Sequence, residues 1–297
     1  MTVAEVIDGK RIAGEIRQEV KQDVDDLRSR GVTPGLAVVL VGDNPASAVY
    51  VRMKAKACEE VGIYSRVLRM SAETSQAELE AVVDDLNADE AIHGMLVQLP
   101  LPSQIEEDAI INRIAPEKDV DGFHPMNVGR MMIGDPNAFR PATPAGVVEL
   151  LMRTGNDPSG KRVTIVGRSN IVGKPLAVML SQKMEGGNAT VTLAHSRTPD
   201  LTAVLREGDI LVAAIGVPEF VKADAVKPGA VVIDVGVNRV DDPSTEKGYR
   251  LVGDVAYDEV AEVASAITPV PGGVGPMTIA MLLANCVKAA RAISGDS

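Results

Sequence analysis

The stretch VTIVGRSNIVGKP, residues 163–175, joins a short β-branched run, a turn containing glycine and the start of a helical pattern. Val163–Val166 predicts a buried strand, and Gly167 lets the chain turn directly into the helix. Backbone N–H groups at such a helix start favour phosphate binding. The spacing departs from G-x-G-x-x-G, because Ser169 replaces the second glycine and Gly173 is displaced by one position. The stretch favours a dinucleotide-binding unit, with a plain strand-to-helix turn as the open alternative.

The same alternation of strand and helix patterns runs through all 297 residues. The predicted strands are Leu36–Val41, Ser65–Met70, His93–Gln98, Arg162–Val166, Thr190–Ala194, Ile210–Ala214 and Ala230–Val235. The predicted helices are Ala46–Val61, Gln76–Asn87, Val172–Lys183 and Ile279–Ala292. Such alternation, with few aromatic residues (2%), predicts parallel sheets with aliphatic cores covered by helices.

A loop-rich stretch around residues 131–144 predicts a domain boundary, and Thr143-Pro144 indicates a helix start within it. We therefore expect an α/β protein of two αβ domains with a cleft between them, which is a common place for a ligand. The first domain covers 1–143 and is completed by the C-terminal helix, 279–297. The second covers 144–278 and is Rossmann-like and dinucleotide-binding.

The formal net charge of −11 argues against nucleic acid and anionic membranes as partners. Cys58 and Cys286 are too few and too far apart for a disulfide framework, so we expect buried thiols in a reducing compartment. The three histidines lack metal-ligand spacing, and no metal is expected. No N-terminal run resembles a secretory signal, and we expect no uninterrupted apolar run long enough to span a bilayer, which predicts a cytoplasmic protein.

The residues after the second strand of the cofactor domain indicate which dinucleotide binds. An NAD-binding unit usually ends this strand with an acidic residue that holds the ribose hydroxyls. Here Thr190–Ala194 is followed by His195–Thr198, which contains no acid. Arg168, Ser196 and Arg197 suit a 2′-phosphate instead, so we predict NADP. The alternative is that the two arginines only cover a solvated surface.

Tyr50 and Lys54 are four residues apart in a predicted helix and therefore share one face. A tyrosine can stack on a flat heterocycle, and a lysine can move a proton when burial lowers its pKa. Because Arg52 and Lys56 are also basic, a solvated helix lysine is the alternative for Lys54.

Two further polar residues lie where a strand or a turn ends. Gln98 follows Gly94–Val97 and is suited to orient a lysine or a substrate amide. Asp121 lies in the segment 118–125, where its carboxylate would suit the N–H edge of a pterin-like ring. An ordinary Asp-Gly turn is the alternative for Asp121.

Two prolines and three glycines occur in the eight residues Pro271–Thr278. They follow the strand-like Ala266–Thr268 and precede a helical run, so we expect an ordered loop that passes close to a ligand. A tight structural turn is the alternative.

Together these motifs resemble the bifunctional methylenetetrahydrofolate dehydrogenase/methenyltetrahydrofolate cyclohydrolase family, over nearly the whole chain. The residues that carry the resemblance are Tyr50-x-x-x-Lys54, Val97-Gln98-Leu99-Pro100, Asp119-Val120-Asp121-Gly122, Gly167-Arg168-Ser169-x-x-Val172-Gly173 and Pro271–Thr278. One departure is Ala142, where members often carry a cysteine. It casts no doubt on catalysis.

The resemblance implies NADP-dependent oxidation of 5,10-methylenetetrahydrofolate to the methenyl compound, followed by hydrolysis to 10-formyltetrahydrofolate by a homodimer without a metal. It implies that Lys54 manages protons, that Gln98 poises it, that Tyr50 packs on the folate and that Asp121 anchors the pterin. The folate site would also include Val97, Leu99, Pro271, Gly272 and Gly273. The cofactor site would include Gly167, Arg168, Ser169, Ser196, Arg197 and Val237.

Two other functions remain open from the sequence. One is a monofunctional NADP-dependent oxidoreductase in which Lys54 is silent, and the other is a non-enzymatic module that senses NADP or folate. The combination of Tyr50, Lys54, Gln98 and Asp121 disfavours the sensor, which needs no proton-transfer group.

Overall fold

The computed structural model describes residues 4–245 and 248–295, and the chain divides into two compact units. Unit 1 contains Met1–Ala13 and Thr143–Thr278, and unit 2 contains Gly14–Ala142 and Ile279–Ser297. The predicted boundary at 143/144 is one residue late, because Thr143 belongs to unit 1. The prediction also differs for the first 13 residues, because β1 (Glu5–Val6) pairs with a strand of unit 1.

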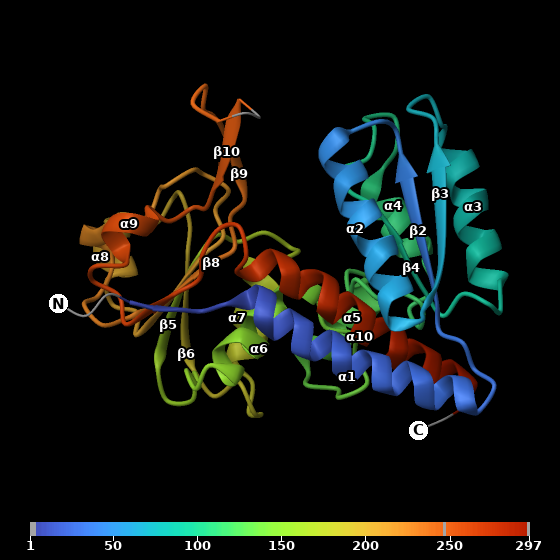
Figure 1. Ribbon diagram of the computed structural model, residues 1–297, viewed down its shortest axis with the longest axis horizontal. Helices are drawn as coiled ribbons and strands as arrows, with labels where there is room; N and C mark the ends of the chain where they lie inside the picture. Colours follow the sequence, from blue (N-terminus) through green and yellow to red (C-terminus); the bar gives the residue numbers. More distant parts are fainter. Residues whose placement is uncertain (1–3, 246–247, 296–297) are drawn as a thin grey trace. The chain divides into compact units, whose positions relative to one another are not determined.

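Unit 1 is built on a six-stranded, fully parallel sheet with the order β1-β11-β8-β7-β5-β6 (Figure 1). Besides β1, its strands are β5 (Arg162–Val166), β6 (Thr190–Ala194), β7 (Ile210–Ala213), β8 (Val231–Asp234) and β11 (Ala266–Ile267). The predicted bounds of β5 and β6 are confirmed, and β7 and β8 are shorter than predicted by one and two residues.

The strand order places a topological switch point between β5 and β7. From β5 the chain crosses through α7 to β6 on one side, and it then returns through α8 to β7 on the other side. In open parallel sheets the ligand crevice lies at the carboxyl ends of the strands at such a point.

The helices of unit 1 cover the sheet, and side chains from α8 and α9 join the strands in one apolar core. These helices are α6 (Ala142–Arg153), α7 (Gly173–Ser181), α8 (Leu201–Leu205), α9 (Tyr257–Val260) and the short η1 (Ala223–Ala225). An antiparallel hairpin of β9 (Asn238–Asp241) and β10 (Tyr249–Val252) was not predicted, because its half-exposed strands carry no long apolar run.

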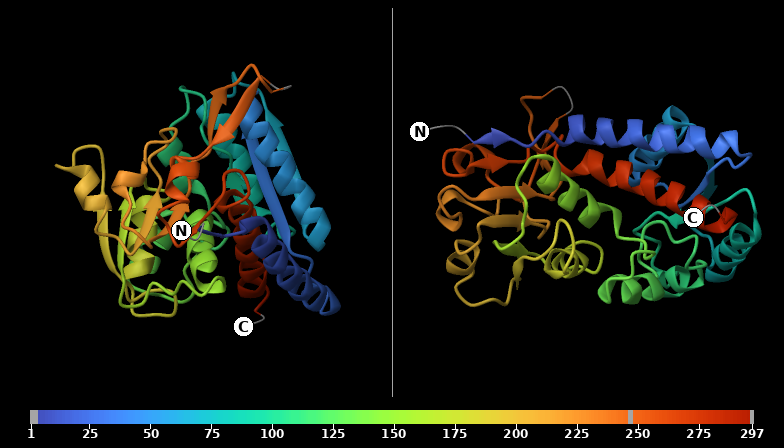
Figure 2. Two further views of the ribbon diagram at one scale, coloured as in Figure 1. Left: turned by 60° about the vertical axis from the view of Figure 1, so that its left-hand side comes forward. Right: turned by 90° about the horizontal axis from the view of Figure 1, so that it is seen from below.

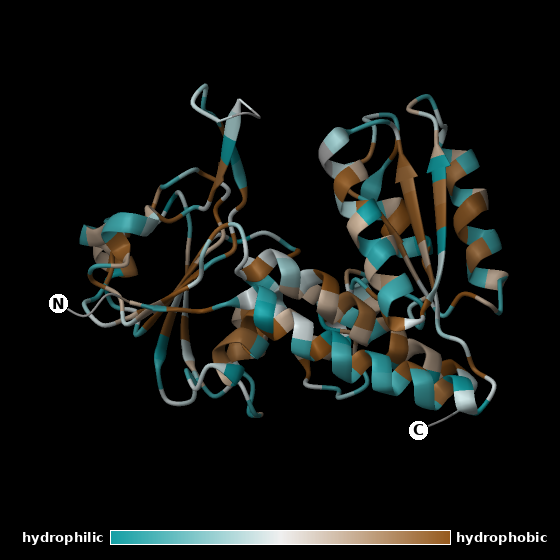
Figure 3. Cartoon of the chain, in the orientation of Figure 1, coloured by the Kyte–Doolittle hydropathy of each residue, from teal (hydrophilic) through white to brown (hydrophobic). Residues whose placement is uncertain are grey.

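Unit 2 contains a three-stranded parallel sheet with the order β3-β2-β4. Its strands are β2 (Gly35–Val41), β3 (Tyr64–Met70) and β4 (Gly94–Val97), close to the predicted ranges. Every residue of β2 is buried, as expected for a central parallel strand, and Figure 3 shows its strongly hydrophobic character.

Helices cover both faces of this sheet, as the further views in Figure 2 show. The helices are α2 (Pro45–Val61), α3 (Gln76–Ala88), α4 (Glu107–Arg113), α5 (Pro125–Met132) and most of α1 (Gly9–Ser29) and α10 (Val274–Ser294). Alternate β2 residues Ala37, Val39 and Val41 pack with α3 and α4 in one core cluster. The other residues of β2 therefore face the opposite side of the sheet.

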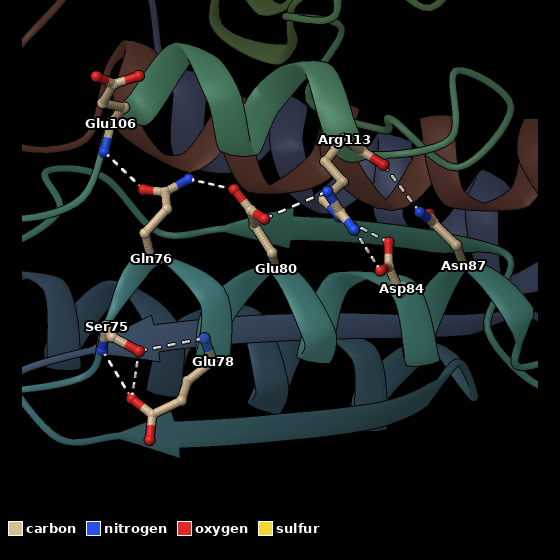
Figure 4. Close-up of polar contacts among 8 residues, drawn as sticks. All are labelled: Ser75, Gln76, Glu78, Glu80, Asp84, Asn87, Glu106 and Arg113. Atoms are coloured by element: carbon tan, nitrogen blue, oxygen red, sulfur yellow. Dashed lines mark hydrogen bonds and ion pairs between the residues drawn. The ribbon is translucent and has the colours of Figure 1, made fainter.

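Hydrogen bonds and ion pairs join α3 to α4 along their shared side (Figure 4). Arg113 of α4 donates to both carboxylate oxygens of Asp84 at 2.8 and 2.6 Å and to Glu80 at 3.3 Å. Ser75 and Glu78 form a reciprocal capping box at the start of α3. The Arg113 contacts hold together the two helices that pack on the β2 and β4 side chains of the core cluster, and the capping box fixes the start of α3.

The helix α10 corrects two sequence expectations. It begins at Val274, so only Pro271–Gly273 of the predicted loop is a loop, because a proline at the third helical position loses no intrahelical hydrogen bond. By length and composition α10 would also suffice to cross a membrane, contrary to the expectation that no run was long enough. Half of that stretch is buried, and Arg291 donates to Asp23 of α1 at 2.6 Å.

Candidate active site and cofactor-binding turn

Lys54 lies on the buried face of α2, with 7% of its surface exposed. Arg52 and Lys56, two residues to either side, are exposed. The helix therefore turns one of three neighbouring basic side chains inward, and the alternative of a solvated Lys54 is wrong. Tyr50, one turn earlier, is 40% exposed and lies toward the N-terminal end of the same face.

The Lys54 amine contacts the end of the neighbouring strand β4. Its Nζ donates a hydrogen bond of 3.1 Å to Oε1 of Gln98, the residue that follows β4. The Gln98 side chain in turn donates through Nε2 to the carbonyl of Leu99 at 2.9 Å, and its backbone N–H donates to the carbonyl of Val39 of β2. The sheet thus fixes the amide oxygen that faces the lysine.

Asp121 reaches this end of the sheet because the segment before it is bonded to β4. Met95 of β4 donates to the carbonyl of Lys118 at 2.8 Å and pairs with Asp119 in a parallel bridge. The buried Lys118 amine is anchored by the carbonyls of Leu86, Asn87 and Asp89 at the C-terminal end of α3. A lysine near a helix C-terminus satisfies carbonyls that the helix leaves unpaired.

Asp119 and Asp121, two residues apart, have opposite environments. Asp119 is 2% exposed, and its carboxylate accepts hydrogen bonds from the N–H groups of Phe123 and His124 and from Asn127. Within residues 4–245 and 248–295, no group donates a hydrogen bond to the half-buried carboxylate of Asp121. Asp119 is therefore structural, whereas Asp121 has acceptor positions for a ligand.

Burial and opposite charge act against each other at this site. Burial lowers the pKa of the Lys54 amine from its ordinary value, and the nearby Asp121 carboxylate partly opposes this shift. Burial raises the pKa of Asp121, the charge of Lys54 lowers it and Asp119 raises it. Cys58, one turn after Lys54, is buried and its pKa is raised to about 12, so it is a neutral thiol. A lysine of this kind exchanges a proton more readily near neutral pH.

The remaining predicted folate-site residues fall into both units. Val97 is the last residue of β4 and Leu99 follows Gln98, so both flank Gln98 in unit 2, but the Val97 side chain is buried in the core cluster with α3 and α4. Pro271, Gly272 and Gly273 belong to unit 1, in the turn between β11 and α10. The peptide bonds Leu99–Pro100 and Val270–Pro271 are both cis.

The turn after β5 has the backbone geometry that a phosphate-binding turn requires. Gly167 has a φ of 124°, and a Cβ there would overlap the carbonyl of Ala214 after β7. A Cβ on Gly173, the first residue of α7, would overlap the carbonyl of Gly167. Ser169 accepts a hydrogen bond from the N–H of Val172 at 3.1 Å. Only glycines fit these two positions, and the tight turn presents the start of α7 at the switch point.

The residues predicted to bind the 2′-phosphate follow two neighbouring strands at one edge of the sheet. β5 and β6 pair with Val166 opposite Ala194, so Arg168 follows one strand and Ser196 and Arg197 follow its neighbour. All three side chains are exposed. His195 orders the second turn, because its Nδ1 accepts a hydrogen bond from the N–H of Arg197 at 3.1 Å.

Val237 follows β8 and is 45% exposed at the same edge of the sheet. Sequence reasoning missed Lys118 and Asp119, which hold Asp121, and it missed the buried carboxylates Asp234 and Asp254. The three aspartates stand next to valine in the sequence, a pattern that any turn would also give, and Lys118 stands between two acidic residues like many surface lysines.

The fold and the two sites define a two-unit α/β protein in which a Rossmann-like dinucleotide-binding unit accompanies a unit with a buried lysine near a carboxylate. Residues 141–294 match the NAD(P)-binding domain of tetrahydrofolate dehydrogenase/cyclohydrolase, and residues 7–121 match its catalytic domain. The chain belongs to this family.

Three relatives illustrate the similarity. The bifunctional protein FolD of Moorella thermoacetica is 59% identical over 97% of this chain and 99% of its own length. The bifunctional FolD structure from Campylobacter jejuni is 48% identical with a TM-score of 0.92, covering 98% of this chain and 99% of that one. The Trypanosoma brucei methylenetetrahydrofolate dehydrogenase-cyclohydrolase, solved with NADP and an inhibitor, is 42% identical with a TM-score of 0.93, covering 99% of each chain.

Proposed function

We propose that this protein oxidises 5,10-methylenetetrahydrofolate to 5,10-methenyltetrahydrofolate with NADP⁺ and then hydrolyses the methenyl compound to 10-formyltetrahydrofolate. The observation that carries the proposal is the buried Lys54 amine, held by Gln98 at 3.1 Å beside a carboxylate to which no described residue donates a hydrogen bond. Family membership supports both activities.

The cofactor half of the proposal fits the residues of unit 1. The Gly167–Gly173 turn and the start of α7 would hold the pyrophosphate, and Arg168, Ser196 and Arg197 would hold a 2′-phosphate. Val237 would contact the nicotinamide side. When bound, NADP⁺ accepts the hydride from the one-carbon bridge of the folate. The protein supplies alignment and electrostatics for this step.

The second reaction needs proton transfer, which hydride transfer does not. Water adds to the methenyl carbon, the bond from that carbon to one ring nitrogen breaks, and one proton is released. Lys54 Nζ would take a proton from the attacking water and return one to the departing nitrogen. The lowered pKa of the Lys54 amine favours this role, because a permanently protonated amine cannot accept a proton.

The folate itself would be held mainly by Asp121. Its half-buried carboxylate has open acceptor positions, which match the N–H edge of a pterin. Tyr50, on the exposed end of the Lys54 face, would stack on a flat ring, and Leu99 would supply an apolar contact. Val97, whose side chain is buried in the core, is a proposed folate contact on the resemblance alone. Pro271, Gly272 and Gly273 are proposed folate contacts on the resemblance alone.

The experiment that tests the function adds 5,10-methylenetetrahydrofolate and NADP⁺ and follows methenyltetrahydrofolate over time. The proposal predicts that the methenyl compound accumulates and then decays. The purified protein should also hydrolyse added methenyltetrahydrofolate without NADP⁺. A monofunctional oxidoreductase would form the methenyl compound without hastening its decay and would fail the second assay, and a binding module would fail both.

The proposal includes the cellular location and the oligomeric state of the enzyme. We place it in the cytoplasm as a homodimer that binds neither nucleic acid nor membranes. The net charge of −11 and the two buried free thiols support this placement. The homodimer rests on the family resemblance, and sedimentation equilibrium tests it.

A further inference from the structure

Two buried aspartates lie at the carboxyl edge of the unit 1 sheet, and the proposed mechanism uses neither. Asp234 is the last residue of β8 and is 3% exposed, and Asp254 follows β10 and is fully buried. Both therefore lie beside the switch point that a dinucleotide would occupy.

Asp254 holds the turn that follows β7. Its Oδ2 accepts hydrogen bonds from the N–H groups of Ile215 and Gly216, each at 2.8 Å. Its Oδ1 accepts a hydrogen bond of 2.9 Å from the side-chain amide of Asn238, at the start of β9. One carboxylate thus fixes two segments at the edge where the cofactor would bind.

Asp234 holds Asp254 in turn. Its Oδ1 accepts hydrogen bonds from the N–H groups of Gly236 at 3.0 Å and Asp254 at 2.9 Å, and its Oδ2 accepts one from Val255 at 2.9 Å. The end of β8, the segment after β10 and the turn after β7 are therefore linked through two carboxylates.

Two glycines make this close packing of carboxylate on backbone possible. A Cβ on Gly236 would overlap Oδ1 of Asp254, and a Cβ on Gly253 would overlap the carboxylate of Asp234. Both positions would be closed to any side chain while the carboxylates stay in place.

The six donors are uncharged N–H groups, and in the described part of the chain neither carboxylate has a cation within ion-pair distance. Negative charge is thus buried at this edge without a cation from the described residues to balance it. Burial accordingly raises the pKa of Asp234 to about 7, and the nearby Asp254 adds to this shift while the N–H groups oppose it.

We propose that Asp254 and Asp234 are positioning residues for the nicotinamide half of the cofactor, and that their buried negative charge favours the cationic oxidised ring over the neutral reduced ring. The inference rests on the proposed use of NADP. The adenosine half belongs over β5 and β6, where the arginines lie, so the nicotinamide half belongs on the side of β7 and β8. A formal positive charge is present on the ring of NADP⁺ and absent from NADPH.

The substitution Asp254→Asn removes the charge of the carboxylate and leaves its hydrogen bonds possible. The asparagine oxygen can still accept from Ile215 and Gly216, and the amide of Asn238 can rotate to accept from the new NH₂ group. The negative charge alone is lost. Asp209→Asn is the matched control, because Asp209 also accepts a backbone N–H on this sheet but lies at the opposite edge, paired with Lys227.

The measurement is the dissociation constant of NADPH, from its fluorescence, and of NADP⁺, by displacement of NADPH, in the full-length protein. We expect Asp254→Asn to weaken NADP⁺ binding about tenfold and NADPH binding less. The dissociation constant of NADP⁺ divided by that of NADPH should therefore rise about threefold or more. Asp209→Asn should leave the ratio unchanged. An unchanged ratio in Asp254→Asn, or equal weakening of both forms, would overturn the inference.

Circular dichroism and thermal unfolding establish that the variants fold. Should Asp254→Asn not fold, Asp234→Asn is measured at about pH 8, where the wild-type Asp234 is mostly ionised, and it must change the ratio in the same direction for the inference to stand. A wild-type protein that binds neither form would contradict the proposed function itself. A wild type that binds both, with a ratio that no variant changes, would contradict only this inference.

Discussion

Buried charged side chains lie at the carboxyl edges of both sheets, and the two groups differ in how fully they are hydrogen-bonded. In unit 1, Asp234 and Asp254 each accept three hydrogen bonds from N–H groups. In unit 2, Lys54 makes a single hydrogen bond and Asp121 accepts none within the described residues. The contrast recurs within one turn of unit 2, where Asp119 accepts three hydrogen bonds.

The number of hydrogen bonds distinguishes charged residues that hold the backbone in place from those that are proposed to react. A buried charge with all its hydrogen bonds made fixes the backbone around it, and its removal leaves several donors without a partner. A buried charge with few hydrogen bonds destabilises the free protein and is available to a ligand. The comparison therefore predicts that the two kinds of residue respond in opposite ways to substitution.

The largest effect is expected for Lys54→Gln. Glutamine is one atom shorter than lysine but keeps an N–H donor for Gln98, and it exchanges no proton near neutral pH. Hydrolysis of methenyltetrahydrofolate should fall by about 10²–10⁴-fold, while part of the dehydrogenase activity remains. Because a buried amine is removed, the free energy of unfolding should not decrease.

The matched control for this prediction is Lys56→Gln, on the exposed face of the same helix, which should leave both activities near the wild-type rate. Undiminished hydrolysis by Lys54→Gln would make Lys54 a bystander and would remove the distinction drawn between the two groups of charges.

Asp119→Ala should show the opposite response. The N–H groups of Phe123 and His124 and the buried Asn127 amide would lose their acceptor, which should lower the free energy of unfolding by about 2–4 kcal/mol. Chemical denaturation measures this loss. Asp25→Ala, which removes only an exposed ion pair with Lys21, is the control and should change it by less than about 1 kcal/mol. Equal effects in the two variants would contradict the structural role of Asp119.

Arg168→Ala removes an exposed positive charge that we expect to bind the 2′-phosphate of NADP⁺. It should weaken NADP⁺ binding by about 1.5–3 kcal/mol, the size of a lost charge-assisted contact, and should leave NAD⁺ binding nearly unchanged. Arg162→Ala is the control, because Arg162 begins β5 at the opposite edge of the sheet. If the wild type bound both cofactors equally, the assignment of Arg168 to the 2′-phosphate would fail.

Local patterns in the sequence predicted the parts of the fold that depend on neighbouring residues. The bounds of β5 and β6 follow from apolar runs that end at polar residues or at glycine. The spacing also placed Tyr50 and Lys54 on one helix face and Gln98 at a strand end, but it left open whether Lys54 is buried, which only the structure decides.

Long-range pairing was not visible in the sequence. The two-residue β1 is exposed and has no apolar pattern, so only its pairing with Ala266 and Ile267 assigns it to unit 1. Asp254 accepts hydrogen bonds from residues 38 and 39 positions earlier in the chain, and nothing local distinguishes it from a surface aspartate. Positioning residues were missed for this reason, whereas the candidate reactive residues were found through their chemistry.

The most direct test of the account is the titration of the Lys54 amine itself. Lysine labelled with ¹⁵N, with the Lys54 signal assigned by its absence from Lys54→Gln, gives the pKa of each amine by NMR. We expect the pKa of Lys54 to lie below the ordinary lysine value and Asp121→Asn to lower it further, because the charge of Asp121 raises it. A Lys54 pKa at the ordinary lysine value, with no response to Asp121→Asn, would contradict the proposed role of Lys54.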